Sequence, residues 1–295
     1  MAIIRINARG GTLELHGNPA APDRHILRAG AEGGPAVIMI HGFKYLPGHR
    51  NHCPHRHILS LDPELLPWRS PSWPRQLGFG LGRADEGLAI AFGWAARGTP
   101  WEAHRRAAEA GRALAKVIAK LHQQDPRRPV HIIAHSMGTE PALEALHHLP
   151  AGAVNRIISM SGASYCGRAA EALKTPAGQA AEFINVISRE NDPFDVVFEA
   201  LVRPGSPGDR AISHGLDAAN AVTLQLDCVE TLDHIARLGV AVGLPDRRIC
   251  HWSSYMRPGA LRFYNELLRN PASLPLPVLR RGLPPEPGRR WSRLF

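Results

Sequence analysis

The chain has 295 residues, of which 44% are hydrophobic and 21% are charged. This composition is ordinary for a globular protein, and it excludes a disordered or collagen-like chain. The formal net charge of +9 suggests an anionic partner, but residues 271–295 hold five arginines against one glutamate and so carry four of the nine charges. The remaining excess has no accompanying nucleic-acid-binding motif, so we expect no nucleic-acid partner.

The N-terminal residues, the apolar runs and the cysteines indicate the cellular compartment. The opening residues, MAIIRINARGG, lack the basic start, apolar stretch and cleavage site of a secretory signal. No apolar run reaches the roughly 20 residues that cross a membrane. Four cysteines without paired spacing favour reduced thiols, namely Cys53, Cys166, Cys228 and Cys250. We therefore expect a cytoplasmic protein with no membrane span.

Hydrophobic periodicity predicts strands and helices that alternate along most of the chain. A hairpin is expected at a sheet edge, over residues 3–15 around an Arg-Gly-Gly break. Apolar runs predict buried strands at 36–40 and 88–94, and the continuing strand–helix alternation predicts further strands at 130–134, 156–160, 183–188 and 222–226. Helices are expected over 101–121, 139–148, 227–238 and 257–268. The alternation is typical of an α/β fold, with a mostly parallel sheet flanked by helices.

Two segments interrupt this alternation. Residues 45–82 are rich in proline, glycine, histidine and tryptophan without sustained periodicity, which indicates a long irregular loop excursion. Residues 271–295 are rich in proline and arginine, and prolines disfavour both helix and sheet. We expect one domain over residues 1–270, followed by a partly extended or disordered tail.

The sequence AHSMG, residues 134–138, directly follows one predicted strand and directly precedes a helix. A sharp turn at this place holds its central serine in a strained conformation with the hydroxyl exposed, and it requires small neighbours such as Gly138. Ser136 is therefore a candidate nucleophile. The alternative is that Ser136 merely caps the helix, since serine is a favoured N-cap. A second loop, HGF at residues 41–43, would lie on the same rim of the sheet and favours the nucleophile.

These two loops also predict an oxyanion site. The backbone N–H groups of Phe43 and Met137 would stabilise the negative charge that forms when Ser136 attacks a carbonyl carbon. Four further residues are expected to contact the substrate, namely His41, Lys44, His135 and Trp252.

The motifs resemble the alpha/beta-hydrolase superfamily, specifically a bacterial esterase/lipase-like branch of poorly characterised function. The resemblance rests on HGF at 41–43, IAFGW at 90–94 and AHSMGT at 134–139, and it is close over residues 36–164. It implies an alpha/beta-hydrolase fold, with residues 1–270 as the catalytic domain and 45–82 as a lid-like loop. It also implies a serine hydrolase that cleaves a carboxylic ester or related acyl bond of a small molecule through an acyl-enzyme, without a cofactor.

The resemblance implies an acid that orients a catalytic histidine. The acid is expected behind the second strand after the elbow strand, where Asp192 lies, and we assign the role to Asp192. Glu190 and Asp195 are nearby alternatives. All three acids can also be read as ordinary turn or cap residues.

The same resemblance places the histidine in the loop before the final helix, where His251 lies. His214 and His234 compete for the role. His234 falls within a helical pattern, and His214 lies close to Asp192 in the sequence. A structural role for His251 stays open, because the chain has 16 histidines.

Residues 48–57 contain four histidines and a cysteine, which invites a metal-site interpretation. Zinc sites usually draw ligands from two separated pairs, and Arg50 and Arg56 within this run would repel a cation. We therefore expect no metal here, and we interpret the run as part of the loop above the active site.

A catalytically inactive binding protein of the same fold is the alternative function. Such a protein would lack a residue of the triad, whereas this chain has a candidate at each position. The triad itself supports ester, thioester and amide hydrolysis as well as acyl transfer, because fold alone does not select the reaction.

Overall fold

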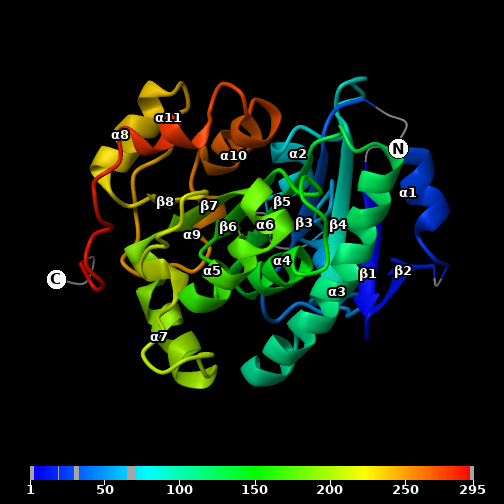
Figure 1. Cartoon of the computed structure of the whole chain (residues 1–295), viewed down its shortest axis with the longest axis horizontal. Helices are drawn as coiled ribbons and strands as arrows, with labels where there is room; N and C mark the ends of the chain where they lie inside the picture. The colour runs from blue at the N-terminus through cyan, green and yellow to red at the C-terminus, as the bar shows by residue number, and fades with distance from the viewer. Residues whose placement is uncertain (1–2, 19, 30–32, 65–70, 293–295) are drawn as a thin grey trace.

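The computed structural model describes the chain except residues 1–2, 19, 30–32, 65–70 and 293–295. A sheet of eight strands runs through the described residues in the order β2-β1-β4-β3-β5-β6-β7-β8 (Figure 1). The strands are β1 (Ile3–Arg9), β2 (Thr12–Leu15), β3 (Ala36–Ile40), β4 (Leu88–Trp94), β5 (Val130–His135), β6 (Arg156–Met160), β7 (Glu182–Ile187) and β8 (Ala221–Gln225). β1 and β2 form an antiparallel hairpin at one edge, and the other neighbouring strands are parallel. The predicted mostly parallel sheet is confirmed.

The central strands β3 and β4 are apolar throughout, because helices cover both faces of the sheet. In β3, Ile38 and Ile40 belong to one hydrophobic cluster, whereas Val37 and Met39 belong to the other. The first cluster is covered by α1 (Asp23–Ala29), α3 (Pro100–Gln124), α4 (Thr139–Leu146), α5 (Cys166–Lys174) and α6 (Pro176–Ala180), and Figure 1 shows α3 to α6 in front of the sheet. The second is covered by α2 (Trp73–Gln76), α8 (Val229–Arg237), α9 (Ser253–Met256), α10 (Ala260–Arg269) and α11 (Leu276–Arg280).

The longest helix, α3, begins at a complete capping box. The Thr99 hydroxyl accepts a hydrogen bond from the backbone N–H of Glu102, and the Glu102 carboxylate accepts one from the backbone N–H of Thr99. Pro100 follows the cap at a position whose N–H has no helical partner. These local signals explain why a helix predicted from residue 101 begins at residue 100.

Residues 45–82 contribute to the core more than the prediction of a lid-like loop implied. Trp73 and Phe79 are fully buried in the second cluster. The ring of His55 is hydrogen-bonded through Nε2 to the Asn7 side chain of β1, at 2.8 Å. Residues 65–70 of this excursion lie outside the described residues. Because its aromatic side chains bury apolar area against the sheet, the described part is anchored to the domain.

The tail also differs from its prediction. α11 buries Leu276 and Leu279 in the second cluster. Further on, the Trp291 backbone N–H donates to the Asp192 carboxylate at 2.6 Å, and Arg290 pairs with Glu199 at 2.7 Å. The described part of the tail is therefore packed on the domain, and residues 293–295 lie outside the described residues. Within the part of the chain that the structure describes, no helix has both the length and the apolar character to cross a membrane.

Candidate active site

Ser136 lies at the turn between β5 and α4, with a backbone φ of +54°. This left-handed conformation is strained for a residue with a side chain. The loop that follows β3 packs directly on the turn, because β3 and β5 are neighbours in the sheet. A Cβ on Gly42 would lie 2.8 Å from the Ser136 Cβ, and a Cβ on Gly138 would lie 2.5 Å from the His41 carbonyl oxygen. Glycine at both positions permits this close approach.

The Ser136 hydroxyl oxygen lies 3.0 Å from Nε2 of His251. His251 belongs to the loop before α9, and the Cys250 N–H ties that loop to the Glu190 carbonyl oxygen at 2.9 Å. Burial lowers the pKa of His251 well below the ordinary value of 6.5, and the positive charge of Lys44 acts in the same direction. The imidazole is therefore neutral at pH 7 and can accept the serine proton.

Asn191 lies against the other ring nitrogen of His251, where the sequence had placed an acid. Its Oδ1 lies 2.6 Å from Nδ1 of His251. The Nδ1–H group therefore donates to the amide oxygen, and Nε2 is left unprotonated toward Ser136. In its turn, the Asn191 amide nitrogen donates to Oδ1 of Asp195 at 2.8 Å. The order of contacts is Ser136, His251, Asn191 and Asp195.

Asp192, assigned from the sequence as the orienting acid, is not in contact with His251. Its carboxylate pairs with Arg189 at 3.2 Å and accepts the Trp291 N–H. The reason is local, since a 3-10 turn (Arg189–Asn191) leads into α7 (Asp192–Leu201). One step along a helix rotates a side chain by about 100°. The neighbouring Asn191, and not Asp192, therefore reaches the histidine.

The alternatives considered from the sequence have other contacts. Glu190 pairs with the buried Arg257, which also donates to the Leu226 carbonyl oxygen. The His234 ring is hydrogen-bonded to the backbone carbonyl oxygens of residues 278 and 279, at 3.2 and 3.0 Å. His214 lies 3.7 Å from the carboxylate of Glu199.

Ser136 opens into a cavity of about 360 Å³ with a largely apolar lining. Both residues expected to form the oxyanion site, Phe43 and Met137, line it. One face of α7 supplies a stripe of four lining residues, which we call the α7 stripe, namely Phe194, Val197, Phe198 and Leu201. The cavity therefore offers an apolar surface that begins at the candidate nucleophile.

Two of the four expected substrate contacts, Lys44 and Trp252, line this cavity, whereas His41 and His135 do not. The buried His41 ring accepts the Trp94 N–H at Nε2, 3.1 Å away, and its Nδ1 bonds to the Gly42 carbonyl oxygen at 2.9 Å. The ring of His135 bonds to the His251 carbonyl oxygen at 3.0 Å. Burial lowers the pKa of both to about 4. These two histidines hold the loops around Ser136 and do not line the cavity.

The histidine-rich run 48–57 divides between two places. His52 and His57 line the Ser136 cavity, and His55 is bonded to β1 as described above. Among the residues that the structure describes, no group of three or more histidines, cysteines or acids is placed to hold a metal ion.

A comparison with protein-family models supports the resemblance expected from the sequence. Residues 76–165 match a model described as an alpha/beta hydrolase of unknown function (DUF900). This segment carries β4, β5 and the turn with Ser136. The chain has the alpha/beta-hydrolase fold. The fold and the superfamily resemblance expected from the sequence are therefore confirmed. A search of curated proteins found no match.

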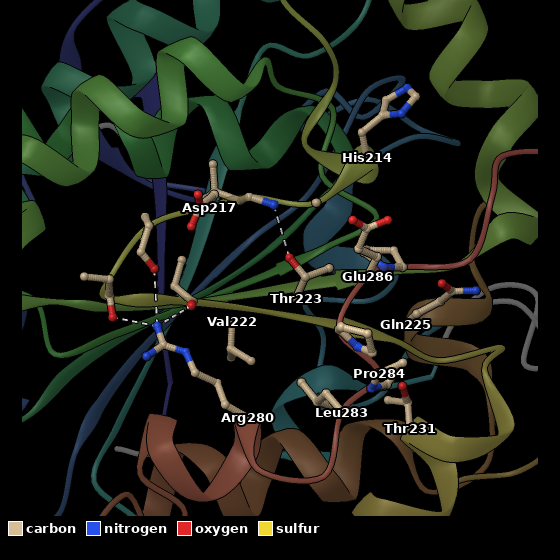
Figure 2. Close-up of a pocket in the computed structure, with 17 residues that line it drawn as sticks. His214, Asp217, Val222, Thr223, Gln225, Thr231, Arg280, Leu283, Pro284 and Glu286 are labelled. Atoms are coloured by element: carbon tan, nitrogen blue, oxygen red, sulfur yellow. Dashed lines mark hydrogen bonds between the residues drawn. The ribbon is translucent and has the colours of Figure 1, made fainter.

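A second cavity, of about 930 Å³, lies between β8 and residues 283–287 (Figure 2). The Arg280 guanidinium borders it and donates to backbone carbonyl groups at 2.6 Å, so its charge is already engaged. Among the described residues that line this cavity there is no serine or cysteine. Despite its smaller volume, the cavity at Ser136 is therefore the candidate active site.

Sequence reasoning missed Asn191. An amide does not titrate, so a search for acids passes over it. The available signal was the spacing of Asn191 and Asp195, which places the two residues one turn apart on the same side of a helix.

Proposed function

We propose that this alpha/beta hydrolase is a serine hydrolase that cleaves carboxylic esters with an apolar acyl group. The observation that carries the proposal is the 3.0 Å contact between the Ser136 hydroxyl and Nε2 of a neutral His251. It occurs at a strained turn that opens into an apolar cavity. If Ser136 only capped the following helix, neither the contact with His251 nor the cavity would be required.

The proposed reaction has two halves. His251 accepts the Ser136 proton at Nε2 while the serine oxygen attacks the ester carbon. The carbonyl oxygen becomes an oxyanion, which the backbone N–H groups of Phe43 and Met137 stabilise. The intermediate collapses, and His251 returns the proton to the departing alcohol. Water then attacks the acyl-enzyme with the same proton transfers, and the carboxylic acid is released.

Asn191 takes the place of the usual acid in this proposal. Its amide oxygen holds the Nδ1–H of His251, which keeps Nε2 free to act as the base. A neutral amide adds no charge to stabilise the imidazolium, so the orientation of the ring is the main contribution of Asn191.

A fluorophosphonate probe tests the proposal directly. We expect the probe to label Ser136 of the wild-type protein, as identified by peptide mass spectrometry, because an activated serine attacks the phosphorus. Ser136→Ala should abolish the labelling, and Ser161→Ala is the matched control, since Ser161 lines the same cavity but bonds to Ser254. Absence of labelling in a folded wild-type protein would contradict the proposal and favour the inactive binding protein.

The α7 stripe yields a prediction about the acyl group. Val197→Asp should raise KM for p-nitrophenyl octanoate about 10-fold. The acyl chain would lose apolar contact, and its binding would have to desolvate the new carboxylate. The effect on p-nitrophenyl acetate should be smaller, since its acyl group does not reach along α7. Val196→Asp is the matched control, because Val196 is 37% exposed on the same helix and does not line the cavity. Equal effects of the two variants on both esters would exclude the stripe as the acyl site.

A further inference from the structure

Asp195 is a buried acid that the proposed reaction does not use. Its side chain is 1% exposed, and it accepts a hydrogen bond from the Asn191 amide nitrogen at 2.8 Å. Asn191 contacts His251 at 2.6 Å through the other end of the same amide. A single amide group therefore connects the carboxylate of Asp195 to the imidazole of His251.

An amide in this position has two orientations of nearly equal shape. With its oxygen toward His251, it accepts the Nδ1–H and leaves Nε2 as a base. With its nitrogen toward His251, it would donate to Nδ1 and favour the tautomer that is protonated at Nε2, which cannot take the proton of Ser136. A neutral Asn191 by itself does not select between these orientations.

The ionised carboxylate of Asp195 makes the selection, because it only accepts hydrogen bonds. It retains the Asn191 nitrogen, and the amide oxygen must then face the histidine. We propose that Asp195 is a positioning residue that fixes the tautomer of His251 through Asn191. This inference rests on the proposed serine hydrolase function and adds a positioning residue behind Asn191.

The surroundings of Asp195 set the pH at which this selection operates. Burial raises the pKa of Asp195 to about 7, the charges of Arg290 and Arg189 oppose the rise, and that of Asp192 adds to it. Below this pH Asp195 gains a proton and no longer requires a donor from the amide. The pKa of His251 lies lower, so the activity of the wild-type protein should fall first with the protonation of Asp195.

The test compares kcat/KM for one p-nitrophenyl ester as a function of pH. Asp195→Asn should lower kcat about 10- to 1,000-fold at pH 8 and leave KM nearly unchanged, because tautomer selection is lost while the cavity is kept. The loss of activity near pH 7 should disappear, and the remaining acid limb should lie below pH 6.5, where His251 titrates. Asp217→Asn is the control, as the same acid-to-amide change at a carboxylate that lines the other cavity.

A double variant distinguishes positioning from a general structural role. Asn191→Asp with Asp195→Asn places the carboxylate directly on His251, and it should recover at least 10-fold of the activity that Asp195→Asn alone has lost. Where Asp195→Asn does not fold, the kcat of the folded double variant decides instead. An unchanged kcat and acid limb in Asp195→Asn, or an absence of recovery in the folded double variant, would overturn the inference. Failure of the proposed function itself shows separately, as a wild-type protein that the fluorophosphonate does not label.

Discussion

Under the proposed function, in which His251 is the general base, replacement of His251 by alanine is expected to lower kcat by about 10⁴- to 10⁶-fold, because loss of the base alone removes most of the rate enhancement of a serine–histidine pair. The physical reason is the contact between Nε2 and the Ser136 hydroxyl, which offers the serine proton its acceptor in the active site. KM should change little, because the apolar lining of the cavity persists. The measurement is steady-state hydrolysis of a p-nitrophenyl ester together with the rate of fluorophosphonate labelling.

An exposed histidine supplies the control for this variant. His148→Ala removes a ring that pairs with Glu144 on α4 and does not line the Ser136 cavity, so its kcat should equal that of the wild-type protein. Retention of a tenth or more of the activity by His251→Ala would assign the base to another group.

Replacement of Arg156 by methionine is expected to reduce the free energy of unfolding by about 3 kcal/mol. Arg156 begins β6, is 2% exposed and pairs with Glu182 of β7. It also donates to the backbone carbonyl oxygens of Leu267 in α10 and of Pro271 and Leu274 at the start of the tail. Methionine fills the volume but leaves these carbonyl groups without donors, and Glu182 without its counter-charge.

Urea unfolding followed by circular dichroism measures this loss. The midpoint should fall with little change in the slope, because the folded surface stays the same. The control is Arg262→Met on α10, where the arginine is exposed, and its free energy of unfolding should lie within about 0.5 kcal/mol of the wild-type value. If Arg156→Met unfolds at the wild-type midpoint, the buried arginine does not hold the tail segment to the sheet.

Much of the fold follows from local patterns. Three predicted strands, 36–40, 88–94 and 156–160, coincide with β3, β4 and β6. A strand that is covered on both faces is mostly apolar, and such a run is visible without knowledge of its neighbours. The turn at Ser136 can also be predicted from the sequence, because the strand, the small residues and the helix are contiguous. α7 was not predicted, since it follows an irregular turn and most of its apolar stripe lines a cavity, with only Phe198 in the core.

The sequence by itself determined the alternation of strands and helices, the alpha/beta-hydrolase resemblance and Ser136 as the candidate nucleophile. The resemblance had pointed to His251 as the partner of Ser136, whereas tertiary structure alone decided which side chain lies behind His251. His251 and Asn191 are separated by 60 residues, and their contact depends on how two loops dock at the ends of the strands. The choice between Asn191 and Asp192 depended on the rotation of one helical step. The physical reason is that the apolar pattern that predicts a strand or helix lies in neighbouring residues, whereas a catalytic site is built from distant segments that only packing brings together.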